Sequence, residues 1–285
     1  MATALEYLES LNSLGSVPGL ASIMELLSRL NNPHRQLKII HISGTNGKGS
    51  TATLVESCLR KAGYRVGLYT SPHLIRYNER FKVDGEEISD DLLASATARV
   101  KEVVDTLEKA PTQFELMTCV GFCCFLEAGC DIVVLEVGLG GRSDTTNVIP
   151  VPEAAVITRI GLEHTEYLGD TLEKIAAVKG GIIKTGCDAV CYRSTESVEQ
   201  VISARCEKVG ARFHKADFDS LKLRSASLEG QVFDWGKFEA LELPLLGDHQ
   251  LHNASVVLSI ADTLIEIGWN ISEQNIRDGI RGVSW

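Results

Sequence analysis

The sequence lacks any hydrophobic run long enough to cross a membrane. Its most apolar stretch, Leu116 to Leu126, has 11 residues, whereas a membrane-spanning helix needs about 20. The first ten residues contain two glutamates and no lysine or arginine, so the basic start of a secretory signal peptide is missing too. We therefore expect a cytoplasmic protein that does not bind membranes.

The sequence also lacks an excess of positive charge. Its 285 residues include 28 Lys+Arg and 38 Asp+Glu, a formal net charge of -10. A protein that binds nucleic acid regardless of base sequence normally presents a basic face, so this class of protein is not expected. The acidic total is still compatible with a locally positive pocket that binds phosphate groups.

The eight cysteines show no spacing typical of a disulfide framework. Cys119, Cys123 and Cys124 lie in the apolar run, where cysteine is a common small buried residue. Cys187 and Cys191 are four residues apart, but no second pair completes a zinc-binding motif. We expect thiols, as in a reducing compartment.

Short apolar runs alternate with helical stretches as far as about residue 210, which predicts βαβ units and a mostly parallel sheet flanked by helices. The expected strands are 38–43, 65–70, 131–137, 154–160 and 189–192. The expected helices are 4–14, 19–30, 48–62, 90–107, 112–128, 172–179 and 197–209, with Thr112 as an N-cap. Beyond residue 211 the pattern predicts a small antiparallel β addition, 221–225, 231–235 and 238–243, and two closing helices, 249–267 and 272–281.

A glycine-rich turn, Gly44-Thr-Asn-Gly-Lys-Gly-Ser50, follows the first of these strands. Glycines let the backbone wrap closely around phosphates, and the loop amides and the helix N-terminus then face the anion. Lys48 can neutralise the outer phosphates, and Ser50 can bind Mg²⁺. The loop departs from the pattern G-x4-G-K-[ST], because Ile42 stands at the first glycine position and Gly49 separates Lys48 from Ser50. We predict that ATP is bound by Gly44, Thr45, Asn46, Gly47, Lys48, Gly49 and Ser50.

Two polar residues follow other expected strands. Glu136 lies at the carboxyl end of the apolar strand 131–137, and His164 follows the strand 154–160. Ligands of open α/β sheets bind at that end of the strands. A single carboxylate after a buried strand has few structural reasons to be there, which favours a functional role.

These stretches together resemble the Mur ligase superfamily. The extra glycine of the phosphate loop and the stretch Tyr69-Thr-Ser-Pro-His-Leu74 resemble its folylpolyglutamate synthase and dihydrofolate synthase branch. The resemblance implies the P-loop type central domain of a Mur ligase. It also implies an ATP-dependent ligase that adds L-glutamate to a folate carboxylate, or to dihydropteroate, through an acyl phosphate intermediate.

The resemblance also implies two Mg²⁺ ions. Ser50 and Glu136 would hold the Mg²⁺ bound to ATP, and Ser71, Glu136 and His164 would hold a second. Oxygen ligands suit this hard cation, and histidine is a less usual but tolerated addition.

Further roles are carried over residue by residue. Lys179 matches the family lysine that becomes carbamylated, and Asn253 in Gly247-Asp-His-Gln-Leu-His-Asn253 would contact the adenine. Asp144 matches a residue near the pterin-bearing substrate. The substrate-binding set is then Asp144, Ser71 and His73, and the catalytic set is Lys48, Lys179 and His164.

Departures from the family pattern cluster near the expected metal sites. Arg159 stands where the family usually has asparagine, and Glu163 stands where it usually has aspartate. Val178 replaces a usual glutamate before Lys179. The departures therefore add one cation and remove one carboxylate near the second metal.

Family enzymes carry a second, smaller α/β domain that supplies much of the glutamate site, and this chain ends near where the linker would begin. We expect residues 1–285 to form an ATP-binding Mur ligase-like domain, with a helical segment (1–37), a parallel α/β core (38–210), and small strands with closing helices (211–285). The C-terminal glutamate-binding domain is expected to be absent, so the chain would be a monomer that needs this domain in cis or in trans.

Two other functions are compatible with the sequence. The chain can be a truncated, non-catalytic ATP-binding module of the same family. It can also be another Mur-type amide ligase that acts on a cell-wall precursor, but Gly49 and the stretch Ser71-Pro-His73 argue against this interpretation because they resemble the folate branch.

Overall fold

The computed structural model describes Glu6, Leu8 and residues 19–284. Apart from Glu6 and Leu8, the helix expected over residues 4–14 lies outside the described residues. Within the described part of the chain, no helix is both long enough and apolar enough to cross a bilayer. All eight cysteines are free thiols, as expected.

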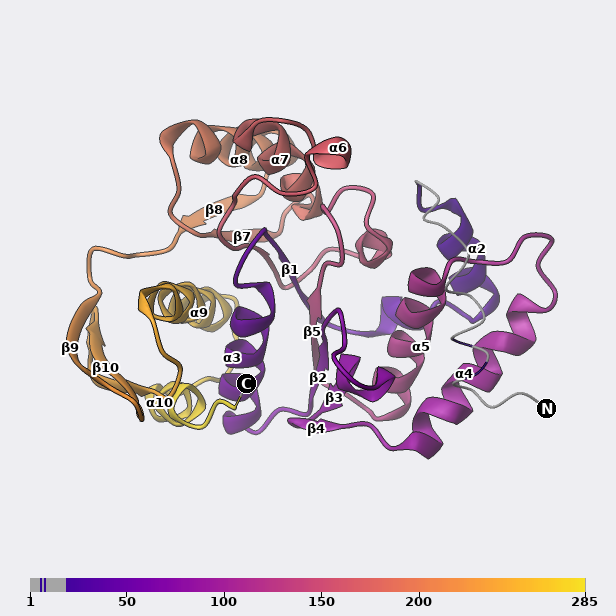
Figure 1. Cartoon of the computed structure of the whole chain (residues 1–285), viewed down its shortest axis with the longest axis horizontal. Helices are drawn as coiled ribbons and strands as arrows, with labels where there is room; N and C mark the ends of the chain where they lie inside the picture. Colours follow the sequence, from indigo (N-terminus) through magenta and orange to yellow (C-terminus); the bar gives the residue numbers. More distant parts are fainter. Residues whose placement is uncertain (1–5, 7, 9–18, 285) are drawn as a thin grey trace.

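A mostly parallel sheet forms the centre of the protein (Figure 1). In the described residues it has the strand order β4-β3-β2-β5-β1-β6-β7-β8. The six strands from β2 to β8 are parallel, whereas β3 pairs antiparallel with β2 and β4 antiparallel with β3. The bounds are β1 Ile39–Ser43, β2 Val66–Tyr69, β3 Phe81–Val83, β4 Glu86–Glu87, β5 Ile132–Glu136, β6 Ala154–Ile157, β7 Asp188–Cys191 and β8 Arg212–Lys215.

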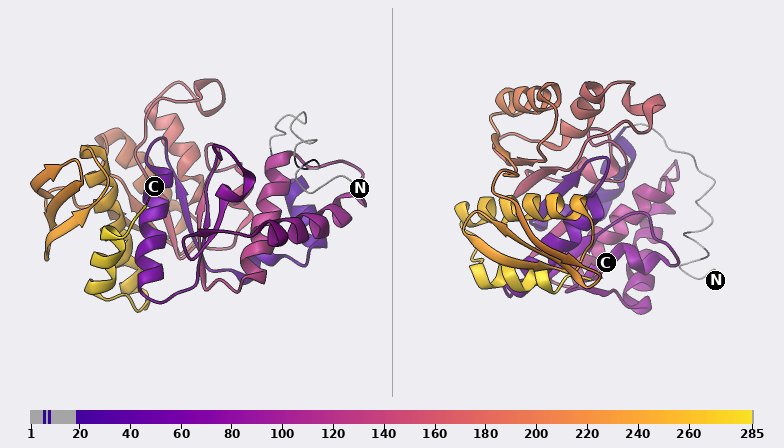
Figure 2. Two further views of the ribbon diagram at one scale, coloured as in Figure 1. Left: turned by 60° about the horizontal axis from the view of Figure 1, so that its bottom comes forward. Right: turned by 60° about the vertical axis from the view of Figure 1, so that its left-hand side comes forward.

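Helices cover both faces of this sheet (Figures 1 and 2). Because successive side chains of a strand point to opposite faces, Ile40 and Ile42 of β1 belong to one apolar core and Ile39 to another. The first core contains residues of α3 (Lys48–Lys61), α9 (Asp248–Glu266) and α10 (Glu273–Arg281). The second contains residues of α2 (Ala21–Arg29), α4 (Asp90–Val104) and α5 (Gln113–Glu127).

A third core lies beside β6 and β7. It joins these strands to α7 (Leu172–Lys179) and α8 (Glu196–Val209), and the short helix α6 (Thr165–Leu168) precedes α7. The carboxyl ends of β1, β2, β5, β6 and β7 point toward the same edge of the sheet because these strands are parallel. That edge therefore brings the expected site segments together.

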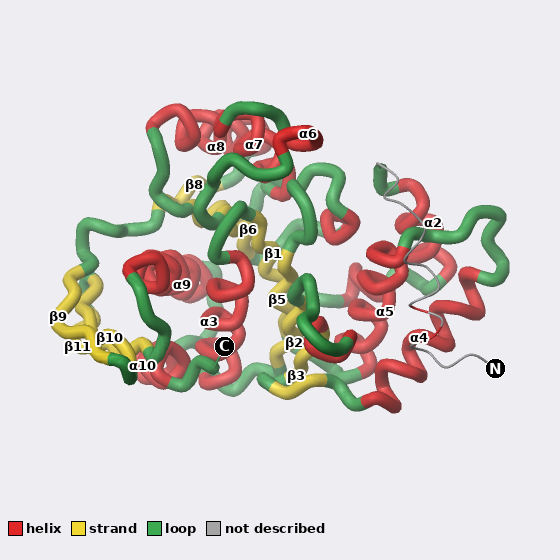
Figure 3. The backbone as a smooth tube through the Cα atoms, in the orientation of Figure 1, coloured by secondary structure: helices red, strands yellow, loops and turns green. Residues whose placement is uncertain are grey.

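The small antiparallel sheet expected after residue 211 is present (Figure 3). Its strands are β9 (Lys222–Ser227), β10 (Gly230–Trp235) and β11 (Phe238–Leu243) in the order β11-β10-β9. Phe233, Trp235 and Phe238 from this sheet are buried in the same core as α3, α9 and α10. The sheet thus covers α9 and α10 on the side away from the central strands.

The long periodic elements match the sequence prediction closely. Helix α7 and strand β11 have the expected bounds, and Thr112 caps α5 as predicted. Its hydroxyl accepts a hydrogen bond from the Glu115 amide at 3.2 Å, and the Glu115 carboxylate accepts one from the Thr112 amide at 2.7 Å. This reciprocal pair is a capping box, which satisfies two amide donors at the helix start.

Three strands were not predicted. β3 and β4 have three and two residues, too few for an alternating pattern to be visible. β8 has the sequence Arg-Phe-His-Lys and lies at the edge of the sheet, where a strand is not buried on both faces. It pairs parallel with β7 and extends the parallel sheet to Lys215, past the expected limit at residue 210.

Helices α3 and α10 approach closely at Gly279. A Cβ atom at this position would lie 2.4 Å from the Cα atom of Cys58. We predict that Gly279→Ala lowers the free energy of unfolding by about 3 kcal/mol, because the neighbouring backbone cannot move aside without separating the helices. Denaturant unfolding monitored by circular dichroism measures the change.

Gly186→Ala is the matched control. Gly186 has a φ of +77°, and a Cβ atom at this position would have no other atom within 4 Å. Its substitution therefore adds only the strain of a left-handed residue, about 1 kcal/mol. Equal losses in the two variants would show that the α3–α10 contact adapts to the methyl group.

Candidate functional site

The glycine-rich loop lies between β1 and α3, as the sequence predicts. Gly47, with a φ of +84°, is the N-cap of α3, and Gly44 has a φ of +154°. A Cβ atom would lie 1.8 Å from the hydroxyl of Thr158 at Gly44 and 2.5 Å from the Asn253 amide oxygen at Gly47. Both positions therefore require glycine, for conformation and for space.

The segment after β6 holds the start of this loop. The carbonyl oxygen of Arg159 accepts hydrogen bonds from the amides of Thr45 at 2.8 Å and Asn46 at 3.3 Å. The Thr45 hydroxyl lies 3.1 Å from both the amide nitrogen and the carbonyl oxygen of Gly161. The loop is thus paired to the neighbouring strand end, while the first amides of α3 have no partner within the helix.

The Lys48 side chain folds back over the phosphate loop. Its ammonium group donates to the carbonyl oxygens of Gly44 at 3.0 Å and Thr45 at 3.2 Å. An ammonium group has three donors, so this arrangement can add a phosphate oxygen without losing the loop contacts. The position fits the role predicted for Lys48.

Helix α9 supports the other end of the loop. Gln250 donates to the Ser50 hydroxyl at 3.4 Å and accepts from the Asn253 amide at 3.0 Å. Asn253 is buried and lies against Gly47. The structure therefore places Asn253 beneath the phosphate loop, where it supports Gly47 directly.

Lys179, at the end of α7, is buried beside the same loop. Its ammonium group donates to the Gly44 carbonyl oxygen at 2.8 Å and to the Glu163 carboxylate at 2.6 Å. Burial lowers the pKa of Lys179, and the Glu163 carboxylate opposes this change. Burial acts to raise the pKa of Glu163, but Lys179 outweighs it and holds that pKa below its usual range. Glu163 is thus the counter-ion of Lys179.

Glu136 and Ser71 meet at the ends of the neighbouring strands β5 and β2. Glu136 is only 5% exposed, and its carboxylate accepts a hydrogen bond from the Ser71 amide at 3.0 Å. Burial raises the pKa of Glu136 to about 7, although the Ser71 amide and the charges of Lys48 and Arg80 act in the opposite direction. A buried carboxylate with one amide donor is a ready partner for a cation.

Asp144 lies inside the loop that follows β5. It is buried, and its carboxylate accepts from the amides of Leu139 at 2.8 Å and Thr146 at 2.9 Å and from the Thr146 hydroxyl. That hydroxyl also lies 2.8 Å from Nε2 of His41. Burial lowers the pKa of His41 to about 3, so the ring is neutral. Because the Thr146 hydroxyl donates to Asp144, it accepts from the His41 tautomer that carries its proton on Nε2. Sequence reasoning missed this chain of hydrogen bonds, because a histidine inside an apolar strand gives no sign of a partner 105 residues away.

His73 lies in the loop after β2. Its Nδ1 accepts from the Arg80 guanidinium at 2.7 Å, and its ring centre lies 4.6 Å from that of Tyr77. The next two residues, Leu74 and Ile75, are 92% and 90% exposed. The Glu79 carboxylate accepts from the amides of both, so the loop presents two apolar side chains to solvent in a fixed shape.

His164 is not joined to the other expected metal ligands. It has a φ of +43°, is exposed, and is the N-cap of the short helix α6. Within the described residues, no three His, Cys, Asp or Glu side chains are grouped so that they could hold a metal ion. The structure therefore brings together Ser71 and Glu136, and separately Lys48, Ser50 and Lys179 around the loop, but it shows no contact that adds His164.

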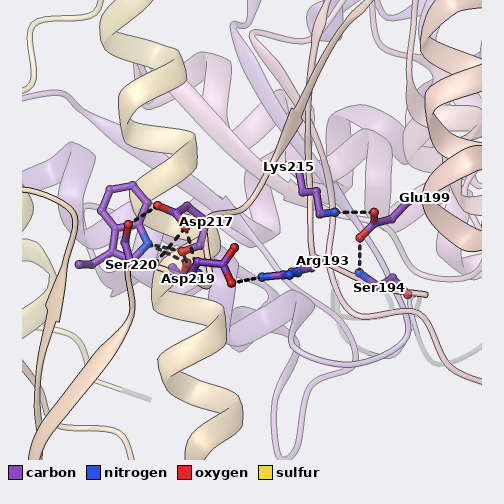
Figure 4. Close-up of polar contacts among 9 residues, drawn as sticks. Arg193, Ser194, Glu199, Lys215, Asp217, Asp219 and Ser220 are labelled. Atoms are coloured by element: carbon purple, nitrogen blue, oxygen red, sulfur yellow. Dashed lines mark hydrogen bonds and ion pairs between the residues drawn. The ribbon is translucent and has the colours of Figure 1, made fainter. Parts of the chain in front are cut away.

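An open cavity of about 510 Å³ lies at the segment after β6, whose Arg159 carbonyl oxygen binds the phosphate loop. Its walls include Arg159, Tyr192, Arg193, Thr195, His249 and His252. Figure 4 shows how part of this wall is held: Arg193 pairs with Asp219, and Glu199 accepts from the Ser194 amide at 2.9 Å and from Lys215 at 2.6 Å. Sequence reasoning missed the cavity, because its residues come from four segments that only the fold brings together.

A glycine loop between a buried parallel strand and a helix, with a lysine at the helix start and a carboxylate at a neighbouring strand end, defines a P-loop type nucleotide-binding α/β protein. Residues 42–261 match the family model described as the Mur ligase middle domain. The chain is 36% identical over 299 residues to the folylpolyglutamate synthase of Lacticaseibacillus casei, covering 99% of this chain and 69% of that protein.

Two further comparisons agree. The chain is 36% identical over 282 residues to the dihydrofolate synthase/folylpolyglutamate synthase of Bacillus subtilis, covering 95% of this chain and 65% of that protein. It superposes with a TM-score of 0.91 and 32% identity on a folylpolyglutamate synthase (FPGS) solved in complex with AMPPCP and folate, covering 100% of this chain and 72% of that one. The chain thus spans about two thirds of the length of these proteins.

The chain belongs to the Mur ligase superfamily and, within it, to the folylpolyglutamate synthase and dihydrofolate synthase family. This confirms the fold class and the family that the sequence predicted. The family consists of ATP-dependent, amide-forming ligases.

The buried carboxylate of Glu136 gives the first prediction about the site. In metal-free buffer at pH 8, we expect Glu136→Gln to raise the free energy of unfolding by about 2 kcal/mol, because the neutral amide avoids the cost of burying an ionised carboxylate. The gain shrinks as the pH falls from about 7 towards 4.5, since the carboxyl group then binds a proton in the folded protein. Urea unfolding at several pH values measures it.

Glu163→Gln is the control of opposite sign. It leaves the buried ammonium group of Lys179 without its counter-ion, so the free energy of unfolding should fall. A loss of stability in Glu136→Gln at pH 8 would mean that Glu136 supports the apo fold and would contradict this interpretation.

Proposed function

We propose that this chain binds MgATP at the loop Gly44–Ser50 and that the protein adds L-glutamate to a folate, or to dihydropteroate, through an acyl phosphate. The observation that supports this most directly is the placement of Lys48 and Lys179 on one carbonyl oxygen, that of Gly44. Two positively charged groups beside the N-terminus of α3 suit the triphosphate of a nucleotide. In the first step the γ-phosphoryl group passes to a substrate carboxylate oxygen, and in the second the amine of glutamate displaces phosphate.

The residues of this chain supply positioning and charge for the first step. Lys48 would contact the phosphates that the loop amides hold. Its positive charge would neutralise the negative charge that develops on the transferred group. In its unmodified form, Lys179 keeps the loop in place through Gly44 and is paired with Glu163. The loop after β2, with Ser71 and His73, and the loop after β5, with Asp144, would border the folate.

The side chains at this edge fit Mg²⁺. Ser50 and Glu136 offer the oxygen donors that this cation prefers, and a cation beside Glu136 would favour its ionised form. Ser50 and Glu136 would hold the Mg²⁺ of MgATP. A second Mg²⁺ at Ser71, Glu136 and His164 would require His164, which in this structure does not contact the other two, to approach them. Bound Mg²⁺ would neutralise phosphate charge in the transition state.

We propose carbamylation of Lys179 as in the family pattern. Carbamylation requires a neutral amine, and burial lowers the pKa of Lys179 in that direction. The modification would replace the ammonium contacts of Lys179 with Gly44 and Glu163 by an anion beside the second metal, and Lys48 would then supply the positive charge at the loop. Asn253 would contact the adenine from α9 while its side chain still lies against Gly47.

Four further expectations belong to this proposal. The protein would act in the cytoplasm and as a monomer, and it would not bind nucleic acid. Its glutamate site would be completed by a C-terminal domain, in cis or in trans. The folylpolyglutamate synthase solved with AMPPCP and folate supports the choice of ATP and folate as ligands.

Substitution of Lys48 tests nucleotide binding. We expect Lys48→Ala to weaken MgATP binding at least 50-fold, because it removes the positive charge of the phosphate loop. An ammonium group hydrogen-bonded to phosphate contributes about 2–3 kcal/mol to binding. Isothermal titration calorimetry measures the affinity. Lys174→Ala is the control, since Lys174 is exposed and paired with Asp170, and unchanged affinity in Lys48→Ala would refute the phosphate-loop assignment.

Release of ADP tests the ligase reaction. We expect ADP formation to depend on both L-glutamate and a folate or dihydropteroate, in the presence of the C-terminal domain, and to be lost in Lys48→Ala. A coupled assay for ADP, with each substrate omitted in turn, provides the measurement. ATP binding without such turnover would favour the non-catalytic module instead.

A further inference from the structure

Arg159 has a fixed place beside the phosphate loop. Its carbonyl oxygen accepts hydrogen bonds from the amides of Thr45 and Asn46 at 2.8 and 3.3 Å, and an isolated β-bridge joins Arg159 to Asn46. The backbone position of Arg159 is therefore set by the loop itself. Arg159 itself is exposed and lines the cavity of about 510 Å³.

The other cations at this edge are neutralised or held by the protein. Lys179 is paired with Glu163, and Lys48 is hydrogen-bonded to two loop carbonyls. Arg193, which also lines the cavity, is paired with Asp219 (Figure 4). Among the described residues, no carboxylate forms an ion pair or a hydrogen bond with the Arg159 guanidinium.

The Arg159 charge acts on two other residues of the cavity lining, Tyr192 and His252. Burial is the main cause of the raised pKa of Tyr192 and of the lowered pKa of His252, and the Arg159 charge lowers both. Tyr192 and His252 line the cavity, and their ring centres lie 6.0 Å apart. Asp248, in the first turn of α9, is the one carboxylate that the described part of the chain places on the lining.

We propose that Arg159 binds the phosphate chain of the nucleotide from the cavity side of the loop, as a second cation beside Lys48. This inference rests on the proposed binding of a nucleoside triphosphate at Gly44–Ser50. A guanidinium group forms paired hydrogen bonds to phosphate oxygens and keeps its charge at every physiological pH. Because its backbone is tied to Thr45 and Asn46, Arg159 reaches the phosphates without any movement of the loop.

Nucleotide binding to the full chain and its variants tests the proposal. We expect Arg159→Gln to weaken MgATP and MgADP about tenfold or more, as loss of a charged hydrogen bond does, while adenosine affinity changes less than twofold. Arg159→Lys should recover part of the loss. Isothermal titration calorimetry measures the phosphorylated ligands, and displacement of a fluorescent nucleotide measures adenosine.

Arg193→Gln is the matched control, because Arg193 lines the same cavity with its charge already neutralised by Asp219. Its affinity for MgATP should stay within threefold of the unmodified chain. Unchanged MgATP and MgADP affinities in Arg159→Gln, or an equal loss for adenosine, would overturn the proposal for Arg159 alone. Absence of MgATP binding by the unmodified chain would overturn the proposed function and this inference together.

Discussion

The carbonyl oxygen of Gly44 accepts hydrogen bonds from two ammonium groups, those of Lys48 and Lys179. This shared acceptor joins the phosphate loop to its own helix α3 and to the end of α7, which lies 135 residues further along the chain. Only glycine fits at position 44, because a Cβ atom there would lie 1.8 Å from the Thr158 hydroxyl. The arrangement concentrates positive charge at one edge of a protein whose net charge is -10.

Such a concentration needs nearby negative charge, and the neighbouring strand ends supply it. Glu163 neutralises Lys179 directly, whereas Glu136 is buried with a single amide donor and a pKa raised to about 7. The two carboxylates thus serve different purposes: one completes an ion pair of the fold, and the other lowers stability unless a cation joins it. A group that destabilises the protein without a ligand is what a binding site retains.

Local patterns predicted most of the fold. The continuous apolar run of residues 131–137 identified a central strand, and the bounds of α7 were visible in its periodicity. The phosphate loop could be recognised because its chemistry lies in seven consecutive residues. The short edge strands β3, β4 and β8 could not, because two to four residues carry no period and an edge strand has no requirement for apolar side chains.

The parts of the site that sequence reasoning missed depend on contacts between distant segments. His41 and Asp144 are joined through Thr146 only because β1 and β5 are neighbours in the sheet. The cavity likewise forms where the ends of β6 and β7 meet the starts of α7 and α9.

Asn253 shows a related effect, since its place beneath Gly47 makes it a support of the loop before it can contact any ligand. The same reasoning explains the departures from the family pattern. Glu163 and Arg159 look like independent substitutions in the sequence, yet both lie on the segment that the loop amides bind, one neutralising a cation and the other adding one. The charge of this edge is therefore set by the segment after β6 as much as by the glycine-rich loop.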